Sequence, residues 1–365
     1  MQGRSGSPLA VAHDYLVDTG GAERVVDILM RTFEGAPLFT SVYNPTCMRE
    51  LNVGTWDVRT SFLQRLARTK EDTMRVFPLI PLAFRSFDLR RYETIISSSS
   101  GFAHHVRPSP GAFHLCYCYT PPRFLWLPDA YFRDRPVLRA ALTPALTVLR
   151  RLDQRASRRV DLYVAISREV AKRIAAIYGR RAEVVHPPVD VTRFKPTAQR
   201  SGRFLIVSRL LAYKRIDLAV AAATQSGFPL DVVGDGPERE RLENLAGPSI
   251  RFLGWQPDDA VREAMATCTA LILAGSEDFG LAVVEAQASG RPPIAFAAGG
   301  ALDTVQDGET GFMFAEQTPE ALARAMRRAM VEGIPVDRLR NWAERFSVAA
   351  FQEKMRALIS TRRGA

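Results

Sequence analysis

Two glutamates in the stretch GSEDFGLAVVEAQASG, residues 275–290, are the first candidates for chemistry. Glu277 stands in a predicted turn after the apolar run ALILAGS, and Glu285 lies eight residues later inside a predicted helix. An ionised carboxylate only accepts hydrogen bonds, so each glutamate suits the hydroxyl groups of a sugar or a ribose. The first N–H groups of such a helix lack intrahelical partners and favour an anion, especially a phosphate. The same spacing also fits a surface helix with solvated acids.

Two cations follow an earlier strand-like run, RFLIVSRL. Arg209 and Lys214 stand between this strand and the next predicted helix, where they could hold a diphosphate and stabilise the charge that develops on it. A solvated basic loop is the alternative for this piece taken alone. Gly20 and Gly21 close the turn after the first predicted strand, LAVAHDYL, and would let a backbone approach a ligand closely.

The elements that must position these residues alternate between strand and helix. This alternation predicts parallel sheets that are covered on both faces. The pattern restarts after the proline-containing stretch VVHPPVDVTRFKP. We therefore predict an α/β protein with two Rossmann-like doubly wound domains that face each other across a cleft, residues 1–188 and 189–345, and a final helical segment, residues 346–365. Ligands of such sheets bind at the carboxyl ends of the strands.

Composition narrows the function classes. The formal charge of +10 is uneven, because residues 1–190 hold 27 Lys+Arg against 18 Asp+Glu, which gives +9, while residues 191–365 hold 22 against 21, which gives +1. A basic first half indicates an anionic partner. Nucleic-acid binding is one alternative, but it predicts a basic stripe with interleaved aromatic residues. The sequence has no GxGxxG fingerprint for a dehydrogenase, no P-loop and no D-x-D that would hold a metal and a diphosphate.

The chain shows no apolar run of the roughly 18–20 residues that would span a bilayer, and its start has no apolar region typical of a signal peptide. We expect a cytoplasmic protein, peripheral at the inner face of the cytoplasmic membrane. Cys116 and Cys118 alternate within HLCYCYT, which predicts two small buried residues on one strand rather than a metal or redox pair.

As a set, these motifs resemble glycosyltransferase family 4, the retaining enzymes of the GT-B fold, over essentially the whole chain. The resemblance rests on the E-x7-E of Glu277 and Glu285 and the Arg209/Lys214 pair in SRLLAYKR, with GDGPERERL and AGGALDTVQDGETGFMF. The segments HDYLVDTGGAERV and YCYTPPRFLW resemble the envelope-polysaccharide branch, which contains many mannosyltransferases.

The resemblance implies a role for each matching residue. Glu285 would bind the nucleotide ribose, and Glu277 the hydroxyls of the donor sugar. Arg209 and Lys214 would grip the diphosphate. Backbone N–H groups would help them, from Phe279, Gly280, Leu281 and Ala282. The base would lie near Phe252 and Leu253, and Gly20 and Gly21 would let the first loop approach the donor phosphate or the acceptor.

The resemblance further implies transfer of a sugar to a lipid-linked or glycan acceptor in cell-envelope or exopolysaccharide synthesis, without metal or other cofactor. GDP-mannose is the favoured donor, with UDP-sugars and other GDP-sugars as alternatives. The final helix would cross back to the first domain. A related enzyme that releases its sugar to water or phosphate, or an inactive regulatory copy, is a further alternative, although intact acids and cations disfavour the inactive form.

One position departs from the family pattern, because Tyr119 stands in YCYTP where relatives often have a histidine that touches the donor sugar. A tyrosine hydroxyl titrates near pH 10, so it exchanges protons less readily at neutral pH. His13, His104 and His105 lie near predicted strand ends and could instead face the cleft, although buried structural histidines are the simpler expectation.

An arginine-rich helical stretch, residues 133–159, together with RVFPLIPLAFRSFDLRRY, combines basic and apolar side chains. This combination favours docking of the first domain on an anionic membrane surface, with a solvated basic face as the alternative.

Overall fold

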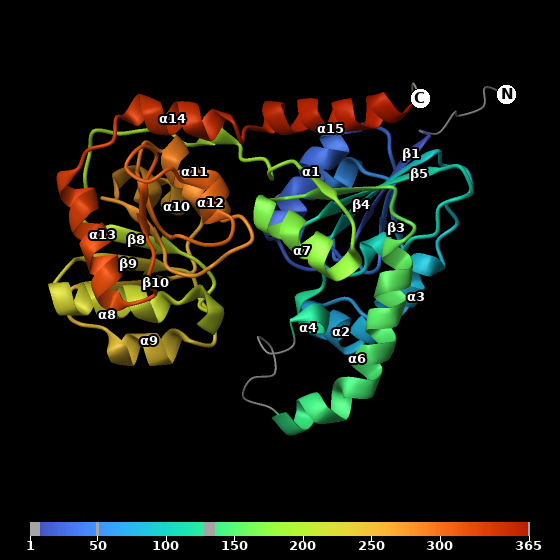
Figure 1. Ribbon diagram of the computed structural model, residues 1–365, viewed down its shortest axis with the longest axis horizontal. Coiled ribbons are helices and arrows are strands. Elements are labelled where there is room, and N and C mark those ends of the chain that lie inside the picture. The colour runs from blue at the N-terminus through green and yellow to red at the C-terminus, as the bar shows by residue number, and fades with distance from the viewer. Residues whose placement is uncertain (1–7, 49–50, 128–135, 364–365) are drawn as a thin grey trace. The chain divides into compact units, whose positions relative to one another are not determined.

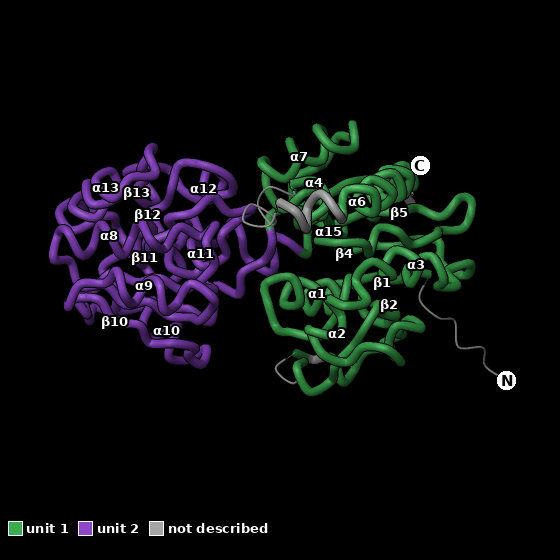
Figure 2. The backbone as a smooth tube through the Cα atoms, turned by 90° about the horizontal axis from the view of Figure 1, so that it is seen from below, with its two compact units in different colours: residues 1–186, 352–365 green, residues 187–351 purple. Residues whose placement is uncertain are grey.

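The computed structural model describes residues 8–48, 51–127 and 136–363. The chain divides into two compact units, shown in different colours in Figure 2. Unit 1 comprises Met1–His186 and Gln352–Ala365, and unit 2 comprises Pro187–Phe351. The division falls between His186 and Pro187, inside the proline-containing stretch that marks the restart of the strand–helix pattern.

Unit 1 is built on a seven-stranded sheet in the order β3-β2-β1-β4-β5-β6-β7, in which every pairing is parallel. Its strands are β1 (Leu9–His13), β2 (Leu38–Thr40), β3 (Val58–Thr60), β4 (Thr94–Ser99), β5 (Phe113–Cys118), β6 (Leu162–Ala165) and β7 (Ala182–Val184). The strands β1 and β4 are buried along their whole length, as expected where helices cover both faces of a parallel sheet. Cys116 and Cys118 are buried in β5, as predicted.

The helices of unit 1 follow the apolar spacing of the sequence. The predicted first helix is α1 (Gly21–Thr32), and its residues Val25, Val26, Leu29 and Met30 are all buried. The others are α2 (Lys70–Arg75), α3 (Ile80–Arg85), α4 (Arg123–Trp126), α6 (Pro136–Ser157) and α7 (Arg168–Tyr178). Short 3₁₀ turns connect them: η1 (Asn52–Thr55), η2 (Phe62–Arg65), η3 (Phe77–Leu79) and η4 (Ala103–His105). Arg133 and Arg135 of the arginine-rich stretch lie outside the described residues.

Unit 2 contains a six-stranded sheet in the order β10-β9-β8-β11-β12-β13, again with every pairing parallel. Its strands are β8 (Phe204–Val207), β9 (Leu230–Val233), β10 (Ile250–Gly254), β11 (Leu271–Leu273), β12 (Pro293–Phe296) and β13 (Phe312–Phe314). The chain order reverses between β8 and β11, which are neighbours at the centre of the sheet. A reversal of this kind is where doubly wound sheets bind ligands.

Helices cover both faces of this sheet. Those after β8, β9 and β10 are α8 (Ile216–Ser226), α9 (Arg239–Leu245) and α10 (Asp258–Thr267), with the 3₁₀ turns η5 (Val191–Arg193) and η6 (Ala212–Lys214). The later ones are α11 (Leu281–Ala288), α12 (Ala301–Thr304), α13 (Pro319–Val331) and α14 (Val336–Glu344). The helix α8 packs against α9 and α13, whereas α11 packs against α10, α12 and α14. Figure 1 shows α8 and α9 on one side of the strands and α10, α11 and α14 on the other.

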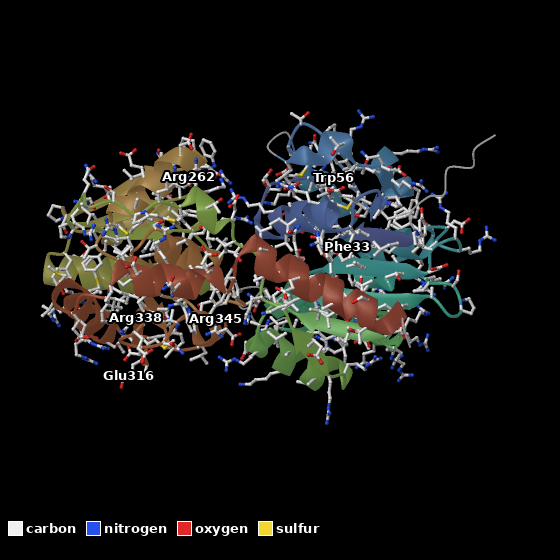
Figure 3. All side chains as sticks on the ribbon, turned by 90° about the horizontal axis from the view of Figure 1, so that it is seen from above. Phe33, Trp56, Arg262, Glu316, Arg338 and Arg345 are labelled. Carbon is white, nitrogen blue, oxygen red and sulfur yellow. The ribbon has the colours of Figure 1, made fainter. Side chains whose placement is uncertain are left out.

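The last helix, α15 (Val348–Arg363), begins in unit 2, and its residues from Gln352 onward belong to unit 1. Charged side chains cover the surface of both units, including Arg338 of α14 and Arg345 just after it (Figure 3). Among the described residues, no helix combines the length and the apolarity that crossing a membrane requires. The two parallel-sheet α/β units confirm the predicted fold class. That they face each other across a cleft stays a prediction.

Candidate functional site

The carboxyl ends of the central strands of unit 2 carry four of the predicted site residues. Arg209 and Lys214 follow β8, while Glu277 and Glu285 follow β11, the neighbour of β8 in the sheet. Because parallel strands end at the same edge of a sheet, the two segments meet there. The predicted cation pair and the predicted acid pair therefore belong to one edge of one sheet.

The clearest contact at this edge joins Lys214 and Glu277. The Nζ atom of Lys214 lies 2.6 Å from Oε1 of Glu277, and both side chains are less than one-fifth exposed. An ammonium group has three donors, so the pair leaves Lys214 able to contact a further anion. Lys214 also lies over the ring of the exposed Tyr213, with Nζ 5.3 Å from the ring centroid.

Close backbone packing fixes the two segments against each other at Gly275. A Cβ atom on Gly275 would lie 2.7 Å from the carbonyl oxygen of Tyr213 and 2.8 Å from that of Lys214. Only glycine allows this approach, because real Cβ atoms do not come so near to backbone oxygens. On the other side, the carbonyl oxygen of Glu277 accepts a hydrogen bond of 2.8 Å from the N–H of Gly300, after β12.

The helix α11 begins beside these groups. Gly280, which precedes its first residue, has φ +85°, a left-handed conformation that glycine adopts without strain. Among the described residues, the N–H groups of Gly280, Leu281 and Ala282 have no hydrogen-bond acceptor. Three donors at the positive end of a helix dipole form a site that attracts an anion. The ring of Phe279 is instead buried and lies 5.6 Å from that of Phe346, so Phe279 can contribute only its backbone.

Glu285 lies on the less buried face of α11. Leu281, Ala282 and Glu285 are half-buried, while the other residues of the helix are buried. Residues separated by three or four positions share a helix face, and side chains tilt toward the helix N-terminus. The carboxylate of Glu285 therefore extends along the same face as the three N–H groups. Gly290, with φ +72°, follows the end of α11, as predicted for its C-terminal cap.

The remaining unit 2 candidates are less enclosed. Arg209 is exposed and has no ion-pair partner within the described part of the chain. Its backbone is fixed through its neighbour Leu210, whose N–H donates to Asp235 O at 2.9 Å. Phe252 is half-buried against the hydrophobic core, whereas Leu253 beside it is exposed. Both lie on β10, at the border of the sheet, next to the strongly exposed Trp255.

In unit 1, Gly20 is the N-cap of α1 and Gly21 is its first residue. The N–H of Gly20 donates to Oε2 of Glu23 at 3.0 Å, which satisfies one donor of the helix N-terminus within the chain itself. Tyr119 is buried, and its hydroxyl donates to the carbonyl oxygen of Ala22 at 3.1 Å and lies 2.9 Å from Ser98 Oγ. Burial raises the pKa of this hydroxyl well above its usual value. The structure thus places Tyr119 as a link between β4, β5 and α1.

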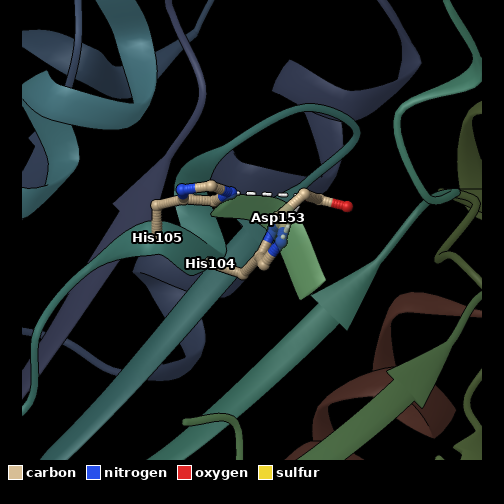
Figure 4. Close-up of side chains that lie close together, drawn as sticks. All are labelled: His104, His105 and Asp153. Atoms are coloured by element: carbon tan, nitrogen blue, oxygen red, sulfur yellow. Dashed lines mark hydrogen bonds and ion pairs between the residues drawn. The ribbon is translucent and has the colours of Figure 1, made fainter. Parts of the chain in front are cut away.

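The three candidate histidines are all buried. His13 bonds to Ser98, while His104 and His105 both contact the fully buried carboxylate of Asp153 on α6 (Figure 4). The two Nε2 atoms lie 3.0 and 3.1 Å from Asp153 Oδ1. The other oxygen, Oδ2, accepts bonds from Trp126 Nε1 at 2.7 Å and from the Tyr178 hydroxyl at 2.8 Å.

These contacts set the charges of the cluster. Although burial lowers the pKa of His104, the hydrogen bond and charge of Asp153 raise it overall. Burial dominates at His105 and lowers its pKa to about 4. Burial opposes ionisation of Asp153, but its bonds to the two imidazoles hold the pKa of the carboxyl below its usual range. The three side chains offer one possible metal-ligand atom each, all within 4.8 Å of one another. Four donors already saturate the carboxylate, so hydrogen bonding accounts for the arrangement.

The sequence did not reveal Gly275, Gly300 or Asp153 as positioning residues. Gly275 and Gly300 stand in short runs of small residues after apolar strands, GS and AAGG, and this is the signal that could have indicated them. Asp153 is separated from His104 by 49 positions, and no local pattern connects the two.

Comparison with known proteins gives matches for unit 2 and for the fold. Residues 190–346 match the family described as glycosyl transferases group 1. A D-inositol 3-phosphate glycosyltransferase of Nocardioides sp. is 29% identical over 222 residues, which are 49% of this chain and 48% of the relative. A glycogen synthase of Xanthomonas euvesicatoria is 38% identical over 135 residues, 34% of this chain and 26% of the relative. The chain thus spans less than half the length of these relatives.

Two solved structures share the fold. HepE of Anabaena, in complex with UDP and glucose, superposes with a TM-score of 0.69 at 18% identity, over 97% of this chain and 99% of the other. Sucrose-phosphate synthase of Thermosynechococcus elongatus gives 0.72 at 17% identity, over 98% and 99%. At this identity the likeness concerns the fold alone. Residues 190–346 therefore match a glycosyl transferases group 1 domain, and the chain as a whole has the fold of these two structures.

Proposed function

We propose that the protein is a retaining glycosyltransferase that moves a sugar from a nucleotide diphosphate donor to a lipid-linked or glycan acceptor in envelope or exopolysaccharide synthesis. One observation carries this proposal. Lys214, Glu277 and the N-terminus of α11 meet at the carboxyl edge of the unit 2 sheet. A site with cations, free N–H donors and carboxylates matches the diphosphate, the ribose and the sugar hydroxyls of such a donor.

In the proposed mechanism, the bond between the anomeric carbon and the diphosphate oxygen breaks first. Lys214, Arg209 and the three N–H groups of α11 stabilise the negative charge that develops on the leaving diphosphate. Glu277 holds hydroxyls of the sugar, and Glu285 those of the ribose. The acceptor hydroxyl attacks from the face that the diphosphate leaves, and a diphosphate oxygen takes its proton. Positioning and electrostatic stabilisation therefore replace a protein nucleophile.

The donor we favour is GDP-mannose, because the N-terminal segments resemble the mannosyltransferase branch. A UDP-sugar is the second candidate, since the related fold of HepE was solved with UDP and glucose. Thermal unfolding in the presence of a panel of nucleotide sugars tests both. Selective stabilisation by GDP-linked sugars supports the first candidate, a clear preference for UDP-linked sugars supports the second, and no stabilisation by any member of the panel contradicts the proposed function.

We further propose that transfer requires no metal or other cofactor, because the side chains and N–H groups already supply positive charge to the diphosphate. Activity should remain within twofold when EDTA is added to the purified protein. A loss that Mg²⁺ or Mn²⁺ restores would overturn this part of the proposal.

We propose that unit 1 docks on an anionic membrane surface, on the cytoplasmic side, where a lipid-linked acceptor lies. Large apolar side chains are exposed on η2, α2, η3 and α3 and next to them: Phe62, Leu66, Met74, Leu79 and Leu82. Cations also gather in this unit. Burial lowers the pKa of Arg85, and further lowering comes from three neighbouring guanidiniums, those of Arg107, Arg159 and Arg155. Basic and apolar side chains together favour binding to anionic lipid.

A further inference from the structure

The carboxyl end of β1 holds a buried pair of side chains that the mechanism above does not use. His13, the last residue of β1, is 1% exposed, and Glu23 in the first turn of α1 is 8% exposed. The Nε2 atom of His13 lies 3.8 Å from Oε1 of Glu23. This separation exceeds a hydrogen bond, although both groups are polar and almost fully buried. The two polar atoms therefore face each other without a hydrogen bond between them.

The partners of His13 define which ring nitrogen carries hydrogen. Nδ1 lies 3.1 Å from the carbonyl oxygen of Ser98 and 3.1 Å from its hydroxyl oxygen. A carbonyl oxygen only accepts hydrogen bonds, so Nδ1 is the protonated nitrogen and donates to it. In the neutral ring Nε2 then has a lone pair, and this lone pair faces Glu23.

Glu23 faces His13 with an acceptor as well. Its Oε2 accepts the N–H of Gly20 at 3.0 Å, which fixes the carboxylate and leaves Oε1 toward the histidine. Two acceptors at 3.8 Å repel an anion and favour a neutral ligand with two hydrogen donors. Neighbouring hydroxyl groups of a sugar meet this requirement, since each can donate to one of the two atoms. A phosphate does not meet it.

We propose that His13 Nε2 and Glu23 Oε1 bind two adjacent hydroxyls of the acceptor sugar. The inference rests on the proposed function and deepens it, because it names the part of the acceptor that unit 1 recognises. We favour the acceptor sugar over the nucleotide sugar as the ligand of this pair. The groups that suit a nucleotide sugar lie in unit 2: the cations, the free N–H groups, and the acids Glu277 and Glu285. Gly20 beside the pair has no side chain to compete with the ligand.

Two substitutions separate this role from a structural one. In Glu23→Gln the amide oxygen can still accept the Gly20 N–H, because glutamine serves in this capping position as glutamate does. Its NH₂ group then replaces Oε1, a donor in place of an acceptor. His13→Asn keeps a side-chain N–H for the Ser98 carbonyl and removes Nε2. Glu93→Gln is the matched control, since Glu93 is exposed and precedes β4, at the opposite end of the sheet from Ser98.

The probes are octyl α-mannoside and octyl β-glucoside, with binding followed by saturation-transfer NMR and transfer followed with a radiolabelled nucleotide sugar. We expect Glu23→Gln and His13→Asn to raise the dissociation constant and KM for the glycosides tenfold or more, with the donor KM within twofold of the wild-type value. Glu93→Gln should match wild type, and circular dichroism should confirm that all variants fold.

The outcomes are distinguishable. If the wild-type protein binds no nucleotide sugar, the proposed function fails. If it binds the donor but neither glycoside, or if both variants bind the glycosides as wild type does, only this inference fails. A rise in the donor KM in place of the glycoside KM would also overturn it, because the pair would then contact the donor sugar.

Discussion

At the scale of single residues, the Lys214–Glu277 contact determines where the positive charge of Lys214 lies in the site. A lone lysine at the end of a strand would sample many rotamers, and ordering its side chain would oppose the binding of a diphosphate. Glu277 holds the ammonium group at 2.6 Å, in a place where both side chains are largely shielded from water. The cation is thus positioned before a ligand arrives, which is the condition for electrostatic stabilisation without reorganisation.

The first prediction concerns this cation. Lys214→Ala should lower kcat by roughly 10²–10³-fold, by analogy with the removal of one oxyanion donor, because the leaving diphosphate loses a positioned positive charge. Steady-state transfer or donor hydrolysis measures the effect. Lys195→Ala is the matched control, since Lys195 is an exposed lysine of the same unit and should keep wild-type activity. A kcat within threefold of wild type in Lys214→Ala would refute the role.

The residue types of the site were predictable from sequence, but their partners were not. Arg209, Lys214 and Glu277 stand beside recognisable strand ends, so local pattern made them candidates. The family resemblance then singled them out, together with Glu285 in the following helix. The pairing of Lys214 with Glu277 joins positions 63 residues apart, and the hydroxyl contacts of Tyr119 join β5 to β4 and α1. Such contacts depend on strand order, which a single sequence does not specify.

At the scale of elements, the site depends on how closely η6 approaches the end of β11. Gly275 mediates this approach, and a methyl group there would meet the backbone of Tyr213 and Lys214. Backbone atoms cannot rotate away as a flexible side chain can. The turn that carries Lys214 would have to move.

The second prediction follows from this contact. Gly275→Ala should destabilise unit 2 by about 1–3 kcal/mol, as overpacking commonly does. A loss of this size corresponds to a fall in Tm of roughly 2–12 °C for a unit of this size. It should also weaken the stabilisation by nucleotide sugars, because Lys214 is displaced. Gly333→Ala is the control, since a Cβ there meets nothing within 4 Å. Equal Tm values for the two variants would contradict the packing argument.

The third prediction concerns the His104–His105–Asp153 cluster, which joins α6 to η4, α4 and α7. A histidine in the unfolded chain takes up a proton near pH 6.5, whereas folded His105 does so only at about 4. As the pH falls below about 6.5, the unfolded chain binds a proton that the folded chain does not, so stability is lost. The loss is on the order of 3 kcal/mol by pH 4. His104, whose pKa is raised in the folded chain, is protonated in both the folded and the unfolded chain well below pH 6.5. It therefore adds no pH dependence to the free energy of unfolding in that range.

Calorimetric unfolding at pH 7.0, 6.0 and 5.0 measures this effect above the range in which Asp153 titrates in the unfolded chain. In His105→Gln the amide can still donate to Asp153, but no proton is exchanged, so Tm should fall less steeply than in wild type. Some slope should remain, since burial also lowers the pKa of His114, to about 3. Parallel curves for wild type and His105→Gln would show that His105 does not titrate as inferred.

At the scale of the whole molecule, the uneven charge of the sequence follows the division of the fold into two units. Alternating strand and helix patterns, with a restart near residue 190, were enough to predict two parallel-sheet units. Apolar residues recur with the period of the helix or of the strand that buries them, so each element type leaves its own pattern in the sequence. The basic excess of residues 1–190 falls in the unit that also exposes Phe62, Leu66, Met74, Leu79 and Leu82. The sequence did not show which of these apolar residues are exposed. They lie on or next to helices and 3₁₀ turns of three to six residues, which are too short to give a clear periodic pattern.

The fourth prediction tests this surface. The protein should sediment with vesicles of phosphatidylglycerol at 50 mM salt and much less with vesicles of phosphatidylcholine, since each basic residue near an anionic surface contributes about 1 kcal/mol. Salt at 500 mM should release it, because screening shortens the reach of the arginine charges. Leu66→Ser/Leu82→Ser should weaken binding about tenfold or more, since two exposed leucines no longer enter the lipid. Leu245→Ser, an equally exposed leucine of unit 2, should bind as wild type. If all three proteins bound alike, or bound neutral vesicles equally well, the apolar and basic side chains of unit 1 would have to serve another partner.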